Sequence, residues 1–196
     1  PPSRLGSCLR LMRPKTGTQL FTLVGHDAGA TAVYSPDGQR IVTASGDKTA
    51  KVWNAKTGKE LWTLTGHNHQ VVSAAYSPDG QRIVTASLDQ TAKVWNAETG
   101  TELLTLKGHE YSVRSAAYSP DGQRIVTASW DGTARIWDAQ TGTELMTLTG
   151  HDGNVYSVVY SADGQRIVTA SWDKTAKVWA AETGTELFTL KGHDST

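Results

Sequence analysis

Histidine, threonine and aspartate recur at fixed spacing along this chain of 196 residues. In one set His109 is followed by Thr127, Asp131 and Trp137. Histidine, a hydroxyl and a carboxylate are the groups of a hydrolytic triad, in which a base activates a nucleophilic oxygen. The set occurs four times, whereas a catalytic site would be expected once. The sequence also lacks a Gly-x-Ser-x-Gly elbow and a phosphate-binding glycine loop. We therefore expect these sets to be structural, and the protein not to be an enzyme.

The same histidines could suggest a metal site. Each ends a Gly-His pair, and the pairs lie one per repeat, without the close paired spacing of a zinc motif. The extra histidine, His69, is expected to be a solvated loop residue. A single cysteine, Cys8, excludes an internal disulfide framework and a cysteine-based zinc site. It is expected to be an unreactive position in a degenerate strand. The sequence predicts no metal and no cofactor.

The histidines mark an internal repeat. The Gly-His pairs end at His26, His67, His109, His151 and His193, so the first spacing is 41 residues and the others are 42. The missing residue lies between His26 and Tyr34. Each unit contains the β-branched runs "RIVTAS" and a second run ending in Trp, separated by turn signals such as "SPDG". Four short strands fit this pattern, ending near Tyr118, Ser129, Trp137 and Leu148 in the third unit, and helical solenoids are excluded.

A four-stranded sheet alone would expose an apolar face, so neighbouring units must stack. Radial stacking covers these faces and protects the strand edges. The predicted fold is all-β, a β-propeller of four-stranded antiparallel blades. Its expected parts are a leader with a degenerate half-blade at 1–26, blades at 27–67, 68–109, 110–151 and 152–193, and a tail at 194–196.

The linked marks of each unit are Gly-His, the turn Asp and Trp followed by Asp or a substitute. By these marks the chain resembles the WD-repeat β-propellers, from Thr16 to Asp194. The literal Trp-Asp pair occurs once, and the four pairs are Trp53-Asn54, Trp95-Asn96, Trp137-Asp138 and Trp179-Ala180. The resemblance implies a hydrogen-bonded clamp in each blade, in which Thr accepts from Trp and donates to His, and His donates to Asp. Ser129 and its equivalents are the alternative hydroxyls. The expected clamps are His26, Thr43, Asp47, Trp53; His67, Thr85, Asp89, Trp95; His109, Thr127, Asp131, Trp137; and His151, Thr169, Asp173, Trp179.

The positions that vary between units are more informative about function. In the family, partner contacts cluster on the face that carries the Gly-His loops and the turn between the second and third strands. The resemblance points to three positions per blade, which are Ala28, Ala30 and Gly46; Gln70, Val72 and Leu88; Ser112, Arg114 and Trp130; and Asn154, Tyr156 and Trp172. Trp, Tyr and Arg are enriched at interaction hot spots. The expected partner-binding residues are Trp130, Trp172, Arg114, Tyr156, Asn154 and Leu88. The alternative is that Trp130 and Trp172 merely cover neighbouring blades.

The composition argues against nucleic acid and membranes as partners. Lys plus Arg and Asp plus Glu both number 19, so no net charge attracts the chain to nucleic acid or a membrane. Nothing approaches the about 20 apolar residues of a membrane span, and the first residues make a poor secretory signal. The expected location is cytoplasmic. Charges that repeat on the third and fourth strands are expected to form a solvated exterior. They are Lys51, Lys93, Arg135 and Lys177, and Glu60, Glu102, Glu144 and Glu186.

The ring implied by the family is incomplete. Residues 8–26 resemble the third and fourth strands of another blade, with Met12 in place of Trp. Members of the family usually need about six to eight blades to close. The chain would then be a homodimer completing a ring of about eight blades, or a fragment of a longer propeller. The expected function is a non-catalytic scaffold for a protein or peptide. The alternatives are a structural or engineered array without a partner, and the sensor fragment of a larger signalling protein.

Overall fold

A computed structural model describes residues 7–12 and 19–192, and every regular element in these ranges is a β-strand. The strands form one two-stranded sheet and four four-stranded sheets, each an antiparallel meander in sequence order. The prediction of an all-β fold with four-stranded blades is confirmed. The described residues include no helix that could cross a membrane.

We number the four-stranded sheets as blades 1 to 4. The two-stranded sheet contains β1 (Ser7–Met12) and β2 (Gln19–His26). Blade 1 contains β3 (Ala30–Tyr34), β4 (Arg40–Ser45), β5 (Ala50–Asn54) and β6 (Glu60–Leu64). Blade 2 contains β7 (Val71–Tyr76), β8 (Arg82–Ser87), β9 (Ala92–Asn96) and β10 (Glu102–Leu106). Blade 3 contains β11 (Val113–Tyr118), β12 (Arg124–Ser129), β13 (Ala134–Asp138) and β14 (Glu144–Leu148). Blade 4 contains β15 (Val155–Tyr160), β16 (Arg166–Ser171), β17 (Ala176–Ala180) and β18 (Glu186–Leu190).

Short polar turns join the strands of each blade. In blade 1 the Ser35 hydroxyl donates to Asp37 and accepts from the Arg40 N–H, which closes the turn between β3 and β4. The Asn54 side chain accepts from two N–H groups of the turn between β5 and β6. Asp138 has the same role in blade 3. The residue after Trp is therefore a turn residue, which explains why Asn and Asp exchange there.

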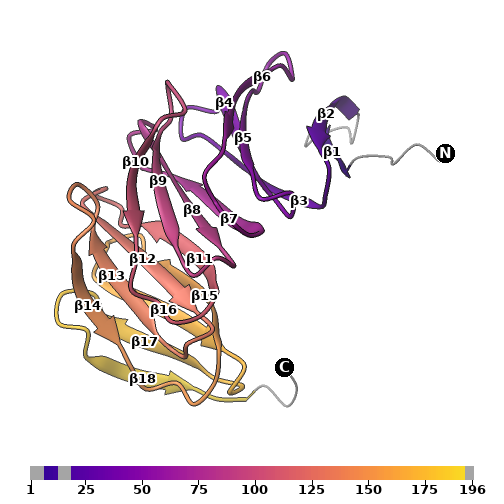
Figure 1. The fold of residues 1–196 in the computed structure, drawn as a ribbon. Helices are drawn as coiled ribbons and strands as arrows, with labels where there is room; N and C mark the ends of the chain where they lie inside the picture. Colours follow the sequence, from indigo (N-terminus) through magenta and orange to yellow (C-terminus); the bar gives the residue numbers. More distant parts are fainter. Residues whose placement is uncertain (1–6, 13–18, 193–196) are drawn as a thin grey trace.

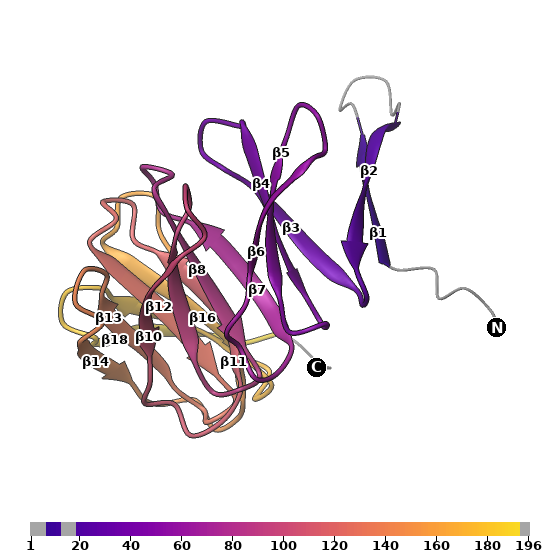
Figure 2. The same cartoon turned by 45° about the horizontal axis from the view of Figure 1, so that its top comes forward.

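The core consists of three nearly identical interfaces between neighbouring blades. Val42, Val52 and Leu64 on one face of blade 1 pack against Tyr76 and Trp95 of blade 2, and all are buried. Equivalent residues form the interfaces between blades 2 and 3 and between blades 3 and 4. The innermost strands β3, β7, β11 and β15 contact one another in turn. Each blade packs mainly against its neighbours, and the blades follow one another in an open arc (Figures 1 and 2).

The two ends of the arc differ from its interior. At one end β1 and β2 lie beside blade 1, where Leu23 packs against Ile41 and Trp53 (Figure 2). This two-stranded sheet leaves the inner strand of blade 1 uncovered, so Tyr34 is 51% exposed whereas its equivalent Tyr76 is 8% exposed. At the other end Val159, Phe188 and Leu190 of blade 4 are about half exposed. Cys8 and Met12 lie in β1, but their side chains, like residues 193–196, lie outside the described part of the chain.

Candidate protein-interaction face

Each blade contains one hydrogen-bonded clamp of four side chains. In blade 3 the Trp137 Nε1–H donates to Thr127 Oγ1 over 2.8 Å, His109 Nε2 lies 2.8 Å from the same hydroxyl, and His109 Nδ1 lies 2.7 Å from Asp131 Oδ2. An ionised carboxylate only accepts, so His109 Nδ1–H donates to Asp131, and in the tautomer with the proton on Nδ1 the Nε2 atom accepts from the Thr127 O–H. Every member is thus satisfied, as a buried network requires. The structure brings together the other three expected sets in the same way.

The clamp also fixes the charge of its aspartate. Burial alone would raise the pKa of Asp131, but hydrogen bonds from His109 and Thr133 outweigh it and hold the pKa well below its ordinary value. At Asp173 the same opposition, with hydrogen bonds from Thr175 and His151, lowers the pKa to about 2. These aspartates are ionised acceptors at neutral pH and hold the imidazoles in one orientation.

In blades 1 to 3 the glycine of the Gly-His pair is explained by close packing against the clamp. A Cβ at Gly108 would lie 2.8 Å from the Arg135 guanidinium and 3.2 Å from the Trp137 ring. Each clamp histidine binds the threonine and aspartate of a single blade, so the four histidines are held in four different blades. His69 is exposed, and its Nδ1 accepts from the Gln70 N–H over 2.8 Å.

The serine before each turn has a different task from the clamp threonine. Ser129 Oγ donates to the Tyr111 carbonyl over 3.0 Å and accepts from the Asp131 N–H. Trp137 donates to Thr127 instead, so the threonine is the clamp hydroxyl. The serine therefore ties the loop that enters the blade to the turn that follows the second strand.

A β-bulge presents one of the variable residues in blades 2, 3 and 4. The pairing of β11 with β12 skips from Val113 to Ser115, which leaves Arg114 as the extra residue. Val72 and Tyr156 are the extra residues of the matching bulges. Bulges re-aim side chains next to binding sites. The adjoining backbone is pinned by a bond from the Trp130 N–H to the Ser112 carbonyl, with equivalents at Leu88 and Trp172.

The register of blade 1 corrects the alignment predicted for that blade. Ala30 pairs with Ser45 as Val71 pairs with Ser87, and the pairing of β3 with β4 continues without a bulge. The Gly46 N–H binds the Gly29 carbonyl, so Gly29, and not Ala28, is the equivalent of Gln70. The residue missing between His26 and Tyr34 is therefore the bulge residue itself. The prediction that Ala30 corresponds to Val72 was wrong, because a count of residues does not show which position a deletion removes.

Arg114, Trp130 and Trp172 form one continuous stack across blades 3 and 4. The Arg114 guanidinium carbon lies 4.9 Å from the centroid of the Trp130 ring, and the Trp130 and Trp172 centroids are 5.4 Å apart at an angle of 44°. Trp130 is half-buried, and its Nε1–H is buried with no hydrogen-bond partner among the described residues. Trp172 is 51% exposed and Tyr156 is 43% exposed. Trp130 therefore has a packing role as well, whereas Trp172 presents its ring to solvent.

Small residues at the other end of this face leave a hollow of about 510 Å³. Ala28, Ala30 and Gly46 of blade 1 line it together with Gln70 and Val72 of blade 2, and Arg114 reaches it from blade 3. Arg114 thus contacts both the hollow and the ring of Trp130. Leu88 and Asn154 are half-buried, and neither lines the hollow.

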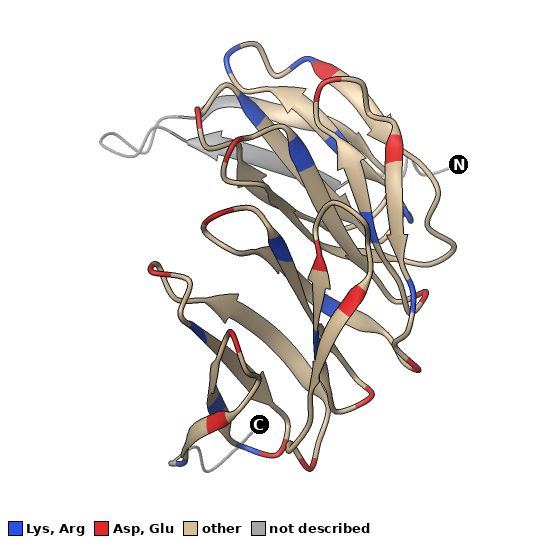
Figure 3. Cartoon of the chain, turned by 90° about the vertical axis from the view of Figure 1, so that its left-hand side faces the viewer, with Lys and Arg blue, Asp and Glu red and all other residues tan. Residues whose placement is uncertain are grey.

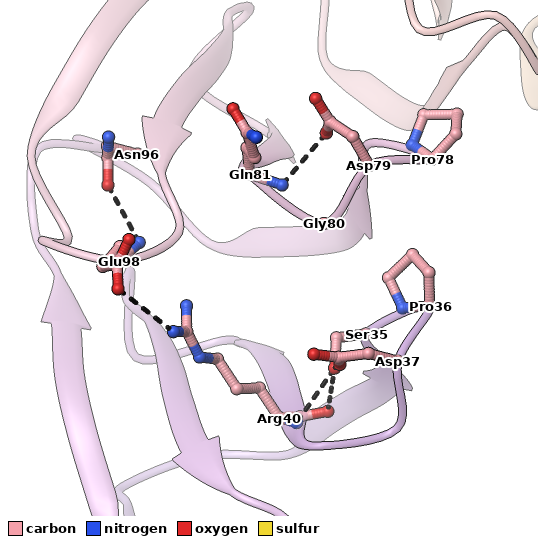
Figure 4. A pocket seen from close by; sticks show the side chains of 10 residues that line it. All are labelled: Ser35, Pro36, Asp37, Arg40, Pro78, Asp79, Gly80, Gln81, Asn96 and Glu98. Atoms are coloured by element: carbon pink, nitrogen blue, oxygen red, sulfur yellow. Dashed lines mark hydrogen bonds and ion pairs between the residues drawn. The ribbon is translucent and has the colours of Figure 1, made fainter.

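The opposite face carries an arginine between neighbouring blades that the sequence analysis did not single out. Arg40, at the start of β4, donates to the Ala97 carbonyl of blade 2 over 2.7 Å and lies near Glu98 at the edge of a polar hollow of about 660 Å³ (Figure 4). Arg82 and Arg124 make the same bond to Ala139 and Ala181. The Gln-Arg pair that precedes each "IVTAS" run is the sequence feature that could have indicated these arginines. This hollow is lined by turn residues that recur in every blade, so its structure follows from the repeat.

The repeated charges of the outer strands form ion pairs. Lys51 binds Glu60 over 2.9 Å and also Thr63, and Arg135 binds Glu144 over 2.6 Å. Basic and acidic residues are interspersed over the blades (Figure 3). The basic side chains of these pairs are 11–18% exposed, so they cover the strands as well as solvate them.

Comparison with known proteins agrees with this architecture. Residues 17–54, 58–96, 100–138 and 142–180 each match the WD domain, G-beta repeat. These matches cover most of the chain, which therefore belongs to the WD40 family. Each matched repeat joins the outermost strand of one sheet to the first three strands of the next.

Two relatives match a single stretch of the chain. The Lissencephaly-1 homolog 1 of Paramecium tetraurelia is 51% identical over 41 residues, which are 20% of this chain and 10% of that protein. WD repeat-containing protein 1 of Gallus gallus is 48% identical over 44 residues, which are 20% of this chain and 7% of that protein. The matches thus span a tenth or less of these relatives.

Proposed function

We propose that this protein is a non-catalytic scaffold that binds a protein or peptide through the face containing Arg114, Trp130, Tyr156 and Trp172. The observation that carries the proposal is the contrast between constant and variable positions. The clamp threonine and tryptophan are buried in every blade and every clamp side chain is hydrogen-bonded, whereas the variable positions of blades 3 and 4 hold a cation and three aromatic rings. WD repeats typically serve as such scaffolds, and half-exposed aromatic residues together with arginine are typical of interaction hot spots.

The experiment compares the replacement of two exposed tryptophans that lie on different faces of the molecule. Binding partners are captured from lysate with the wild-type chain, with Trp172→Leu and with Trp62→Leu, because Trp62 is 38% exposed on the outer strand of blade 1. Leu88 holds the place of Trp172 in blade 2, so the fold accepts leucine there. Partners that bind the wild type and Trp62→Leu but not Trp172→Leu support the proposal. Partners that bind all three proteins equally contradict it, and capture of none favours the array without a partner.

A second proposal concerns the uncovered face of blade 4. Leu190 is half exposed there, whereas its equivalents Leu64, Leu106 and Leu148 are buried under the next blade. We propose that a second copy of the chain covers this face, as the blades cover one another within the arc. Sedimentation of Leu190→Lys and of Leu187→Lys tests it, because Leu187 matches Leu103 and Leu145, which are exposed in blades 2 and 3 although the next blade is present there. Dimers lost only in Leu190→Lys support the idea. A stable wild-type monomer at micromolar concentration overturns it and favours a longer propeller that supplies the next blade.

A further inference from the structure

The charge of Arg114 has no counter-charge in the described part of the chain. Its guanidinium lies over the Trp130 ring, and the residue as a whole is half-buried. The other half-buried arginines of the described blades have oxygen partners, as Arg135 binds Glu144 and Arg124 binds the Ala181 carbonyl. A cation held partly out of water loses hydration that only an anion or several acceptors restore. The guanidinium fork matches a carboxylate in shape and charge.

The hollow beside Arg114 has a complementary chemistry. Ala28, Ala30, Gly46 and Val72 give it small apolar walls beside the polar Thr31 and Gln70, and Arg114 is the one charged residue that lines it. The repeat accepts larger residues at this position, because blade 2 holds Leu88 and blade 3 holds Trp130 in the place of Gly46. In blade 1 a Cβ at Gly46 would lie 3.2 Å from the Ala28 Cβ, so the neighbouring loop would have to shift slightly. The hollow can therefore take an apolar side chain whose neighbour in the ligand reaches Arg114.

We propose that the partner is an acidic peptide segment, in which a carboxylate side chain flanked by an apolar one binds this face. The carboxylate pairs with Arg114, the apolar side chain fills the hollow lined by Ala28, Gly46 and Val72, and the adjoining residues contact Trp172. This inference rests on the proposed function and specifies the chemistry of its site. The whole chain has no net charge, so the charge complementarity is local to Arg114. Binding should weaken as added salt screens the pair of Arg114 and the carboxylate. It should not depend on the net charge of the partner.

The test selects short random peptides displayed on phage with the wild-type chain and then measures synthetic peptides by calorimetry. Arg114→Val is the informative variant, since Val72 occupies the same bulge position in blade 2. Arg166→Val is the matched control, because it removes the same charge from an exposed site. Arg166 is the first residue of β16, at the end of the strand away from Trp172. Gly46→Leu fills the hollow with the residue that blade 2 carries, and thermal unfolding of each variant checks that it folds.

The expected result is enrichment of Asp or Glu next to an apolar residue in the selected peptides. Their affinity should fall at least about tenfold with Arg114→Val, with Gly46→Leu and with the Gln or Asn form of the peptide, but not with Arg166→Val. Peptides that need Trp172 but lack an acidic residue, or that bind Arg114→Val as well as wild type, overturn this inference and leave the proposed function standing. If no selected peptide depends on Trp172 or Arg114, both are overturned.

Discussion

The indole rings of Trp130 and Trp172 meet across the boundary between blades 3 and 4, with their centroids 5.4 Å apart. Both residues precede the turn aspartate of their blade, so the repeat gives them the same backbone. Trp130 lies between Arg114 and Trp172, whereas Trp172 has no further blade beside it among the described residues. The presence or absence of a neighbouring blade therefore explains why Trp130 packs against other side chains whereas the Trp172 ring is exposed.

This difference predicts unequal effects of the same substitution. Trp172→Leu should lower the free energy of unfolding by about 0.5 kcal/mol, because its half-exposed ring loses only the pair with Trp130. Trp130→Leu should lower it by about 1–2 kcal/mol, because the cation–π contact with Arg114 is lost together with the aromatic pair. Urea denaturation of the two variants measures both values. Equal losses, or a greater loss at Trp172, would contradict the assignment.

The clamp predicts a large effect of a small change in blade 3. Thr127→Val keeps the shape of the side chain but leaves the Trp137 N–H and His109 Nε2 buried without their shared partner. The free energy of unfolding should fall by about 2–3 kcal/mol. Thr149→Val is the control, because Thr149 is exposed just after β14. Urea denaturation that shows similar small losses for both variants would mean that the clamp is not the source of stability.

The ionised clamp aspartates predict loss of stability in acid. Hydrogen bonds from Thr49 and His26 outweigh the effect of burial and lower the pKa of Asp47 to about 2, as similar bonds do for Asp173. A carboxyl whose folded pKa is depressed stabilises the fold fully above its unfolded pKa of about 4, and this contribution is lost as the pH falls toward about 2. The urea concentration at the midpoint of unfolding should therefore decrease as the pH is lowered from about 4 to about 2. Asp173→Asn should be less stable at neutral pH and should approach the wild type as pH falls, and a constant difference between the two would refute this origin.

Much of the fold could be predicted because each unit repeats its turn signals. Strand ends at Tyr118, Ser129 and Leu148 coincide with the expected ones, and the third strand ends at Asp138, one residue beyond Trp137. The clamp was expected from the family resemblance, but the sequence left the choice between Thr127 and Ser129 open. Both face the same way on one strand, and only the position of the Trp137 ring decides between them.

Other features depend on contacts that a single unit does not contain. The bulge at Arg114 is a property of the register between two strands, and composition does not reveal it. The bond from Arg82 to the Ala139 carbonyl joins residues of different blades. The packing of Trp130 against Trp172 also depends on the neighbouring blade, so the sequence could not separate packing from recognition there.

The arginine between blades predicts a difference between two identical sequence positions. Arg82→Met removes a charged hydrogen bond to the Ala139 carbonyl and should lower the free energy of unfolding by about 1–2 kcal/mol. Arg166→Met alters the same position of blade 4, where the side chain is exposed and no further blade is described. It should change stability by less than about 0.5 kcal/mol. Denaturation curves for the pair give the comparison, and equal losses would show that the contact between blades contributes nothing.

The residue after each turn aspartate offers a final test of local strain. Lys48 and Gln90 adopt positive φ angles of 75° and 73°, in the left-handed region where side chains are disfavoured, whereas blade 3 has Gly132 at 84°. Lys48→Gly and Gln90→Gly should each raise the free energy of unfolding by about 0.5–1 kcal/mol, since relief of strain exceeds the added freedom of the unfolded chain. Gly132→Gln should lower it by a similar amount, because a Cβ there would meet its nearest neighbour only at 3.7 Å and backbone strain is the remaining cost. Urea denaturation of the three variants checks the signs, and a stabilising Gly132→Gln would contradict the strain.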